Sequence, residues 1–158
     1  MPSVYIETSI PSYYHETRKG SIVTAWHETT RRWWDSYRHM YDLCISQFVV
    51  AELARAPTSK AARLRRLIEG IPLLDEPPGL QDVVQYYFEH RFMPIEAGGD
   101  AFHLAMASIH NVDFLLTWNC RHLANVNKMP HLRVLNGRLG LPVPTVTTPL
   151  TLMPEVST

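Results

Sequence analysis

The sequence lacks a long apolar run, and no stretch approaches the roughly 20 consecutive apolar residues that a membrane-spanning helix needs. Its N-terminus has no cationic start followed by an apolar segment, and it meets an acidic residue early, at Glu7. We therefore expect neither a membrane protein nor a secretory leader.

Cysteine and net charge are also scarce. The chain has two cysteines, Cys44 and Cys120, which is too few for a disulfide scaffold and favours a reducing, cytoplasmic location. Fifteen Lys and Arg residues balance 15 Asp and Glu residues, so the overall charge indicates no polyanionic partner. Internal repeats and low-complexity tracts are absent from the sequence as well.

What is present is the composition of a folded domain. The 158 residues are 46% apolar and 19% charged, which excludes a disordered chain. A chain of this length buries about 68–70% of its unfolded surface and so forms a core without disulfides. We predict a single domain spanning residues 1–158, because domains of roughly 100–200 residues are the norm.

Strand-like and helix-like segments alternate along the chain. The predicted strands are 3–6, 43–45, 71–74, 113–117 and 143–147, and the predicted helices are 21–41, 47–55, 59–69, 80–92 and 100–110. We place 143–147 at a sheet edge because of its prolines. This alternation predicts an α/β fold with three layers, in which helices flank a mostly parallel central sheet.

Local patterns support three of the helices. An apolar stripe at helical spacing marks one face of 21–41, made of Ile22, Trp26, Thr29, Trp33, Tyr37 and Met40. Ser46 stands where an N-cap is expected before 47–55. Within 80–92 we expect Leu80, Val83, Val84 and Tyr87 to face inward, and within 100–110 Ala101, Leu104, Ala105 and Ser108.

Polar side chains follow the predicted strands. Glu7 comes directly after the first strand, and Asn119 comes two residues after Thr117. Glu52 lies in an apolar helix, and Asp100 begins another. Parallel sheets bind ligands at the carboxyl ends of their strands, so these four side chains can meet at one edge. Clustered carboxylates call for a cation, and hard oxygen ligands suit Mg²⁺ or Mn²⁺.

Each of these residues also has a purely structural interpretation. Glu7 could be a solvated loop residue, and Asp100 could be favoured by the helix dipole alone. Asn119 could simply cap the turn that ends at His122. Glu52 is costly to bury without a partner, because its neighbours are apolar. The metal site therefore depends on the joint placement of all four residues.

Four segments of the chain resemble the PIN-domain family, and in particular its VapC-type toxins, over most of the length. They are Val4-Tyr5-Ile6-Glu7-Thr8-Ser9, Ser46-Gln47-Phe48-Val49-Val50-Ala51-Glu52-Leu53, Asp100-Ala101-Phe102-His103-Leu104-Ala105-Met106-Ala107 and Leu115-Leu116-Thr117-Trp118-Asn119, and they occur in the order of the family. The third and fourth segments are the most specific.

The resemblance implies a function as well as a fold. The usual activity of the PIN-domain family is metal-dependent cleavage of RNA with Mg²⁺ or Mn²⁺, which leaves a 5′-phosphate and a 3′-hydroxyl. It assigns a catalytic, metal-holding role to Glu7, Glu52, Asp100 and Asn119, and a supporting, substrate-side role to the Ser9 hydroxyl. Many family members are held in check by an antitoxin protein and many form homodimers, so we expect both kinds of partner.

Two positions depart from the family pattern, which usually has Asp at both. Glu7 keeps the negative charge of an Asp, but its carboxylate reaches farther by about one C–C bond and its side chain has an additional rotatable bond. Asn119 offers an amide oxygen without charge, so the site holds three formal charges instead of four. The alternative to an active nuclease is thus a weakened or inactive PIN-like module that binds RNA or a partner protein.

Several basic residues and His103 are further candidates for a role in binding or catalysis. Arg121 lies nearest the proposed site and could bind RNA phosphates, whereas the cluster Lys60, Arg63, Arg65 and Arg66 could instead meet an acidic partner protein. His103 comes one turn after Asp100; it could serve as a general base, but a core histidine is favoured. A metal-dependent phosphatase is disfavoured because the sequence has no Asp-x-Asp motif.

Overall fold

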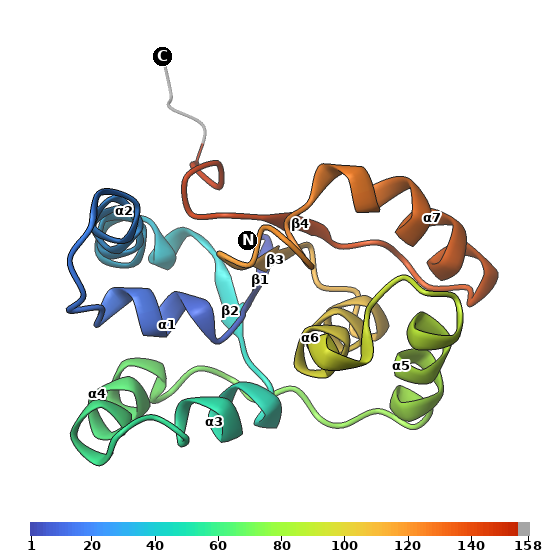
Figure 1. Ribbon diagram of the computed structural model, residues 1–158, viewed down its shortest axis with the longest axis horizontal. Coiled ribbons are helices and arrows are strands. Elements are labelled where there is room, and N and C mark those ends of the chain that lie inside the picture. The colour runs from blue at the N-terminus through green and yellow to red at the C-terminus, as the bar shows by residue number, and fades with distance from the viewer. Residues whose placement is uncertain (155–158) are drawn as a thin grey trace.

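A central sheet of four parallel strands organises the protein, as seen in a computed structural model that describes residues 1–154 (Figure 1). The strands are β1 (Ser3–Ile6), β2 (Asp42–Cys44), β3 (Phe114–Leu116) and β4 (Thr145–Thr147). Their spatial order is β2-β1-β3-β4, and every neighbouring pair is parallel. All four strands therefore end at the same edge of the sheet.

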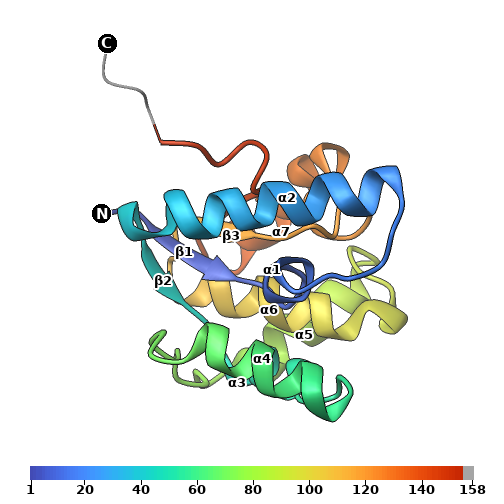
Figure 2. The same ribbon diagram turned by 90° about the vertical axis from the view of Figure 1, so that its left-hand side faces the viewer.

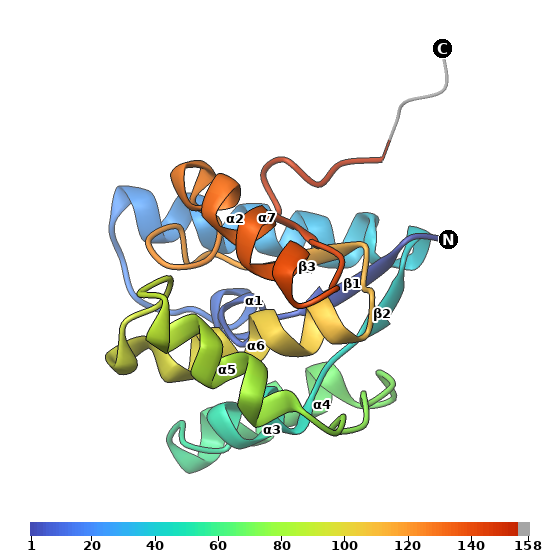
Figure 3. The same ribbon diagram turned by 90° about the vertical axis from the view of Figure 1, so that its right-hand side faces the viewer.

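Helices cover both faces of this sheet. The α-helices are α1 (Ser9–Tyr14), α2 (Ser21–Ser36), α3 (Gln47–Leu53), α4 (Thr58–Ile68), α5 (Leu80–Glu89), α6 (Gly98–Ile109) and α7 (Met129–Arg138). Helices α1, α2 and α4 lie on one side (Figure 2), and α5, α6 and α7 lie on the other (Figure 3). Short 3₁₀ turns occur at Arg38–Met40, Ile95–Ala97 and Val126–Lys128. The predicted three-layer α/β fold is confirmed.

The core is built around β1. Val4, Tyr5 and Ile6 have no solvent exposure, and Leu115 and Leu116 of the neighbouring β3 have none either. A strand covered by helices on both faces buries every side chain rather than every second one. The residues that directly follow β1 and β3 consequently lie at the rim of a dry interior.

Several local predictions are confirmed. Ser46 caps α3 by accepting a hydrogen bond from the backbone N–H of Phe48 at 3.2 Å. The inward faces predicted for α5 and α6 are buried as expected. The last strand, β4, lies at a sheet edge.

Other local predictions are wrong. The helix predicted for 21–41 ends at Ser36, and Ile22 and Met40 are exposed, because the buried side of α2 is formed by Thr30, Trp33 and Trp34. The strand predicted for 71–74 is reduced to a single bridge between Ile45 and Leu73.

Two helices, α1 and α7, were not predicted. Helix α1 begins directly after the loop that follows β1 and contains Pro11 in its first turn, where proline is tolerated. Helix α7 contains Pro130 and Gly137, which weaken its helical pattern, while Leu132 and Leu135 are buried against the core. Tertiary packing, rather than local propensity, therefore stabilises both segments.

Two further findings bear on the predictions made from the sequence. Within residues 1–154, no helix combines the length and the apolar character needed to cross a membrane. Cys44 is buried and Cys120 is exposed, and both are free thiols.

Asn136 links three helices through its buried amide. Its nitrogen donates to Ser108 Oγ at 3.0 Å and to the carbonyl of Pro142 at 2.9 Å, and its oxygen accepts from Tyr87 Oη at 2.7 Å. The residue has no solvent exposure, so these partners cannot turn to water instead.

We predict that Asn136→Ala lowers the free energy of unfolding by about 2–4 kcal/mol, because it leaves several buried polar groups unpaired. Urea denaturation measures the change. Val134→Ala on the exposed side of the same helix is the control, and we expect it to change stability by less than about 0.5 kcal/mol. Equal losses in the two variants would contradict this account of the Asn136 amide.

Candidate functional site

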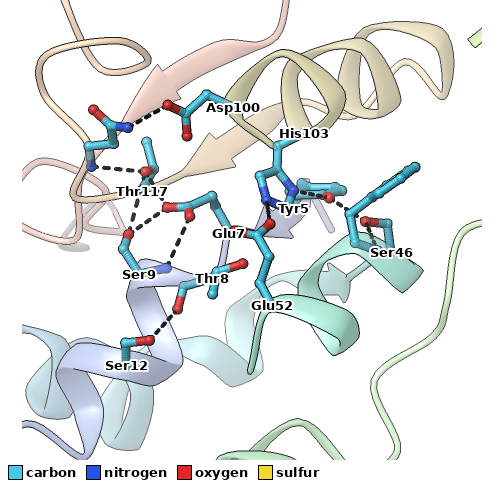
Figure 4. Close-up of polar contacts among 12 residues, drawn as sticks. Tyr5, Glu7, Thr8, Ser9, Ser12, Ser46, Glu52, Asp100, His103 and Thr117 are labelled. Atoms are coloured by element: carbon cyan, nitrogen blue, oxygen red, sulfur yellow. Dashed lines mark hydrogen bonds and ion pairs between the residues drawn. The ribbon is translucent and has the colours of Figure 1, made fainter. Parts of the chain in front are cut away.

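The site lies at the edge of the sheet where β1 and β3 end (Figure 4). Ile6 pairs with Leu116 across the two strands, and the next residue, Glu7, donates its N–H to the Leu116 carbonyl at 3.1 Å. Glu7 and Thr117 are therefore neighbours at the strand ends. Helix α6 brings Asp100 to this edge from one face of the sheet, and α3 brings Glu52 (Figure 4).

Glu7 is almost completely buried and accepts three hydrogen bonds. Its carboxylate accepts from the hydroxyls of Ser9 and Thr117 and from the backbone N–H of Ser9, the last at 3.1 Å. The Ser9 hydroxyl in turn accepts the N–H of Trp118 at 2.8 Å. The predicted supporting hydroxyl of Ser9 thus contacts Glu7 directly and connects the start of α1 with the end of β3.

Glu52 forms an ion pair with the fully buried His103. The imidazole Nε2 of His103 contacts Glu52 Oε1. Burial by itself raises the pKa of Glu52, but the hydrogen bond and charge of His103 outweigh it and hold that pKa below its usual value. Burial by itself lowers the pKa of His103, and the bond to Glu52 with the nearby carboxylates raises it above its usual value.

Asp100 is paired with Asn119. The amide nitrogen of Asn119 donates to Asp100 Oδ2 at 2.8 Å, and the amide oxygen accepts the backbone N–H of His122 at 3.0 Å. The turn-capping role considered for Asn119 is therefore present in the structure. The oxygen that was predicted to hold a metal ion is turned toward the chain's own backbone.

The acidic side chains lie close enough to repel one another. Burial, together with the charges of Glu7 and Glu52, raises the pKa of Asp100 to about 6. The nearby His103 and the Asn119 amide favour the charged form of Asp100 and only partly offset this effect. A bound cation would relieve the repulsion.

The predicted metal ligands thus share one sheet edge, but each is occupied by a partner within the chain. Within residues 1–154, no three His, Cys, Asp or Glu side chains form a ready-made metal site. The oxygen chemistry of Glu7, Glu52 and Asp100 suits Mg²⁺ or Mn²⁺, whereas the orientation of Asn119 does not. The metal-holding roles of the four residues stay predictions.

One further oxygen is available at the site. Thr8 Oγ1 is buried and has no hydrogen-bond partner among residues 1–154, and it lies close enough to Glu52 to favour the charged carboxylate (Figure 4). Buried polar atoms are seldom left unpaired, so this hydroxyl is a spare donor between Glu7 and Glu52.

Sequence reasoning missed three polar residues beside the carboxylates: Thr117, which bonds Glu7, and Tyr5 and Ser46, which extend the contacts of His103. A tyrosine in a fully buried strand needs a partner for its hydroxyl, and that signal could have identified Tyr5. The sequence indicated only that Thr117 ends a strand. Its bond to Glu7 was not predicted, because the two residues are 110 positions apart.

Basic side chains border the site in two grooves that meet at Glu52. One groove also contains Asp100 and Arg55, and the other contains Glu7, Lys60 and Arg18. The predicted substrate residue Arg121 is exposed on the turn after Asn119. Each groove also contains a further acidic side chain, Glu96 in the first and Glu16 in the second, and Glu16 pairs with Arg18 at 2.9 Å.

No protein-family model and no curated protein matches the sequence of this chain.

We predict that Asp100→Asn stabilises the protein at pH 7 in the absence of divalent ions. A folded pKa of about 6, above the ordinary value of 3.8, means that the folded state holds the proton more tightly, so stability falls as the pH rises from 3.8 to about 6. We expect a gain of about 1 kcal/mol after allowing for partial solvation, and no gain below pH 3.8. Thermal unfolding across this pH range measures it.

Asp82→Asn is the matched control, because Asp82 occupies the same third position of α5 but is exposed. It should lose about 0.3–1 kcal/mol at pH 7 through the helix dipole. A loss of the same size in Asp100→Asn would show that the carboxylates are not in conflict.

Proposed function

We propose that the protein is a metal-dependent endoribonuclease, a hydrolase that cleaves RNA phosphodiester bonds. The observation that carries the proposal is the meeting of Glu7, Glu52 and Asp100 at the carboxyl edge of a parallel sheet, where burial and the charges of Glu7 and Glu52 raise the pKa of Asp100 to about 6. Buried carboxylates that destabilise one another are typical of sites built for a cation. The resemblance to PIN domains supports the same conclusion.

In this proposal Glu7, Glu52 and Asp100 hold Mg²⁺ or Mn²⁺, with Thr8 Oγ1 as an additional oxygen. The ion would supply neutralisation of phosphoryl charge and a more acidic hydrolytic water. Ser9 and Thr117 keep the Glu7 carboxylate in place through their hydroxyls. Water adds to phosphorus, the bond to the 3′-oxygen breaks, and that oxygen takes up a proton.

Basic side chains in the grooves beside the carboxylates support the proposal that the substrate is a polyanion such as RNA. Arg55 borders one groove and Lys60 borders the other, so a strand passing over Glu52 meets one cationic side chain on each side, while Arg18 is paired with Glu16. Phosphate contacts of this kind supply most sequence-independent affinity for nucleic acids. Arg121, beyond Asn119, extends this positive border in the proposal.

An antitoxin protein remains part of the proposal as an acidic partner. A groove between α3 and α4 is lined by apolar side chains that include Val50 and Leu53, with Arg65 at its edge. Homodimerisation is also proposed, although the aromatic side of α2 packs within the chain through Trp33 and Trp34.

One observation favours a second candidate, an inactive or weakened PIN-like binding module. Asn119 presents its amide nitrogen to Asp100 and its oxygen to His122, so the fourth position contributes no charge and no free oxygen. Such a module would still bind RNA or a partner protein through basic side chains such as Arg55, Lys60 and Arg121.

We predict that Asp100→Asn abolishes RNA cleavage although the variant is at least as stable as the wild-type protein. Removing the charge weakens cation binding at the centre of the site. Cleavage of a labelled single-stranded RNA, with and without Mg²⁺ or Mn²⁺, measures the effect, and Asp82→Asn should cleave normally. Cleavage that persists in Asp100→Asn, or without divalent ions, would refute the nuclease proposal.

We predict that Asn119→Asp destabilises the metal-free protein and tightens Mn²⁺ binding roughly tenfold, because it places a fourth carboxylate against Asp100. Calorimetric titration with Mn²⁺ measures the affinity, and Asn127→Asp at an exposed position is the control. A small change in cleavage supports a working wild-type site. A large gain from an inactive wild-type protein supports the binding module instead.

A further inference from the structure

A series of buried hydrogen bonds leads from the core to Glu52 (Figure 4). Ser46 Oγ lies 2.6 Å from Tyr5 Oη, Tyr5 Oη lies 2.6 Å from His103 Nδ1, and His103 Nε2 contacts Glu52. We call Ser46, Tyr5 and His103 the polar series. All three residues have no solvent exposure, and they come from the cap of α3, from β1 and from α6.

The hydrogen bonds of the polar series have a consistent direction. A carboxylate only accepts, so His103 Nε2 donates to Glu52. In the ion pair with Glu52 the ring carries a proton on each nitrogen, so Nδ1 donates to the Tyr5 hydroxyl, which donates in turn to Ser46 Oγ. Ser46 Oγ also accepts the N–H of Phe48 at 3.2 Å. Both nitrogens of His103 are therefore bonded, and these two bonds fix the orientation of the ring.

The Tyr5 hydroxyl is the hydrogen-bond partner of His103 Nδ1, an atom that water cannot reach. The cap of α3 uses the Ser46 oxygen, and the Tyr5 ring packs in the core. A phenylalanine would keep the ring in place but leave His103 Nδ1 without this partner. What the hydroxyl adds is control over His103, and through His103 over Glu52.

Glu52 is the carboxylate most in need of such control. Its side chain is part-exposed, unlike the buried Glu7, and it lies where the two grooves meet. It also packs against the first turn of α6: a Cβ added at Gly99 would lie 3.7 Å from both of its oxygens. The position of the Glu52 carboxylate next to Asp100 thus depends on its bond to His103.

We propose that Tyr5, backed by Ser46, is a positioning residue that acts through His103 to orient Glu52 toward a divalent cation. The inference rests on the proposed function, since it takes Glu52 as a ligand. Residues that bond a metal ligand from behind fix its orientation, and their loss typically weakens metal binding about 10–100-fold. Tyr5 touches neither the cation nor the substrate in this role.

The test compares Tyr5→Phe with Tyr87→Phe. Both changes delete the hydroxyl of a fully buried tyrosine, but the Tyr87 hydroxyl bonds Asn136, away from the carboxylates. The probe is Mn²⁺ alone, titrated calorimetrically into the full-length protein without RNA. We expect Tyr5→Phe to bind Mn²⁺ about 10–100-fold more weakly than the wild-type protein, and Tyr87→Phe to bind it equally well.

A second readout uses the metal-free protein. The Nε2 proton of His103 should give a slowly exchanging NMR resonance in the wild-type protein and in Tyr87→Phe, and Tyr5→Phe should lose it. Should Tyr5→Phe fail to fold, His103→Gln interrupts the same series and should weaken Mn²⁺ binding to a similar degree.

The outcomes separate the two proposals. Equal Mn²⁺ affinity in Tyr5→Phe and Tyr87→Phe, with binding by the wild-type protein, overturns the positioning role and leaves the nuclease proposal standing. Absence of Mn²⁺ binding by the wild-type protein overturns the nuclease proposal and this inference together.

Discussion

The central constraint in this protein is the crowding of acidic side chains at one end of a parallel sheet, a repulsion that the contacts of the site have to offset. Parallel strands covered by helices on both faces bury every residue, so Glu7, directly after β1, is forced into the interior. Glu52 and Asp100 approach the same edge from two helices, and their charges with burial raise the pKa of Asp100 to about 6. Buried carboxylates that repel one another are typical of sites that bind a cation.

Each carboxylate is stabilised by a different kind of partner. Hydroxyls and a backbone N–H surround Glu7, an imidazole holds Glu52, and an amide nitrogen meets Asp100. These partners allow the metal-free chain to fold, and they also explain why residues 1–154 show no ready-made metal site. A cation that binds at this edge then replaces some of these hydrogen bonds within the chain. The affinity for the metal therefore depends also on the residues that bond the carboxylates, such as His103.

Periodicity and strand ends predicted the layers, the parallel sheet and the edge to which the acidic residues belong. They could not predict the direction of the Asn119 amide, because that depends on the His122 N–H of a turn formed only in the folded chain. The bond between Tyr5 and His103 joins residues 98 positions apart, which no local pattern reveals. Helices α1 and α7 were not predicted for a related reason, because tertiary packing rather than helix propensity stabilises them.

The most direct test of the account is a crystal structure of the protein soaked in Mn²⁺, with the anomalous signal of manganese recorded. The account predicts an anomalous peak within about 2.0–2.3 Å of oxygens from Glu7, Glu52 and Asp100, with Glu52 still bonded to His103 through its other oxygen. An Mn²⁺ peak on another surface, or none at this edge at saturating Mn²⁺, would contradict it.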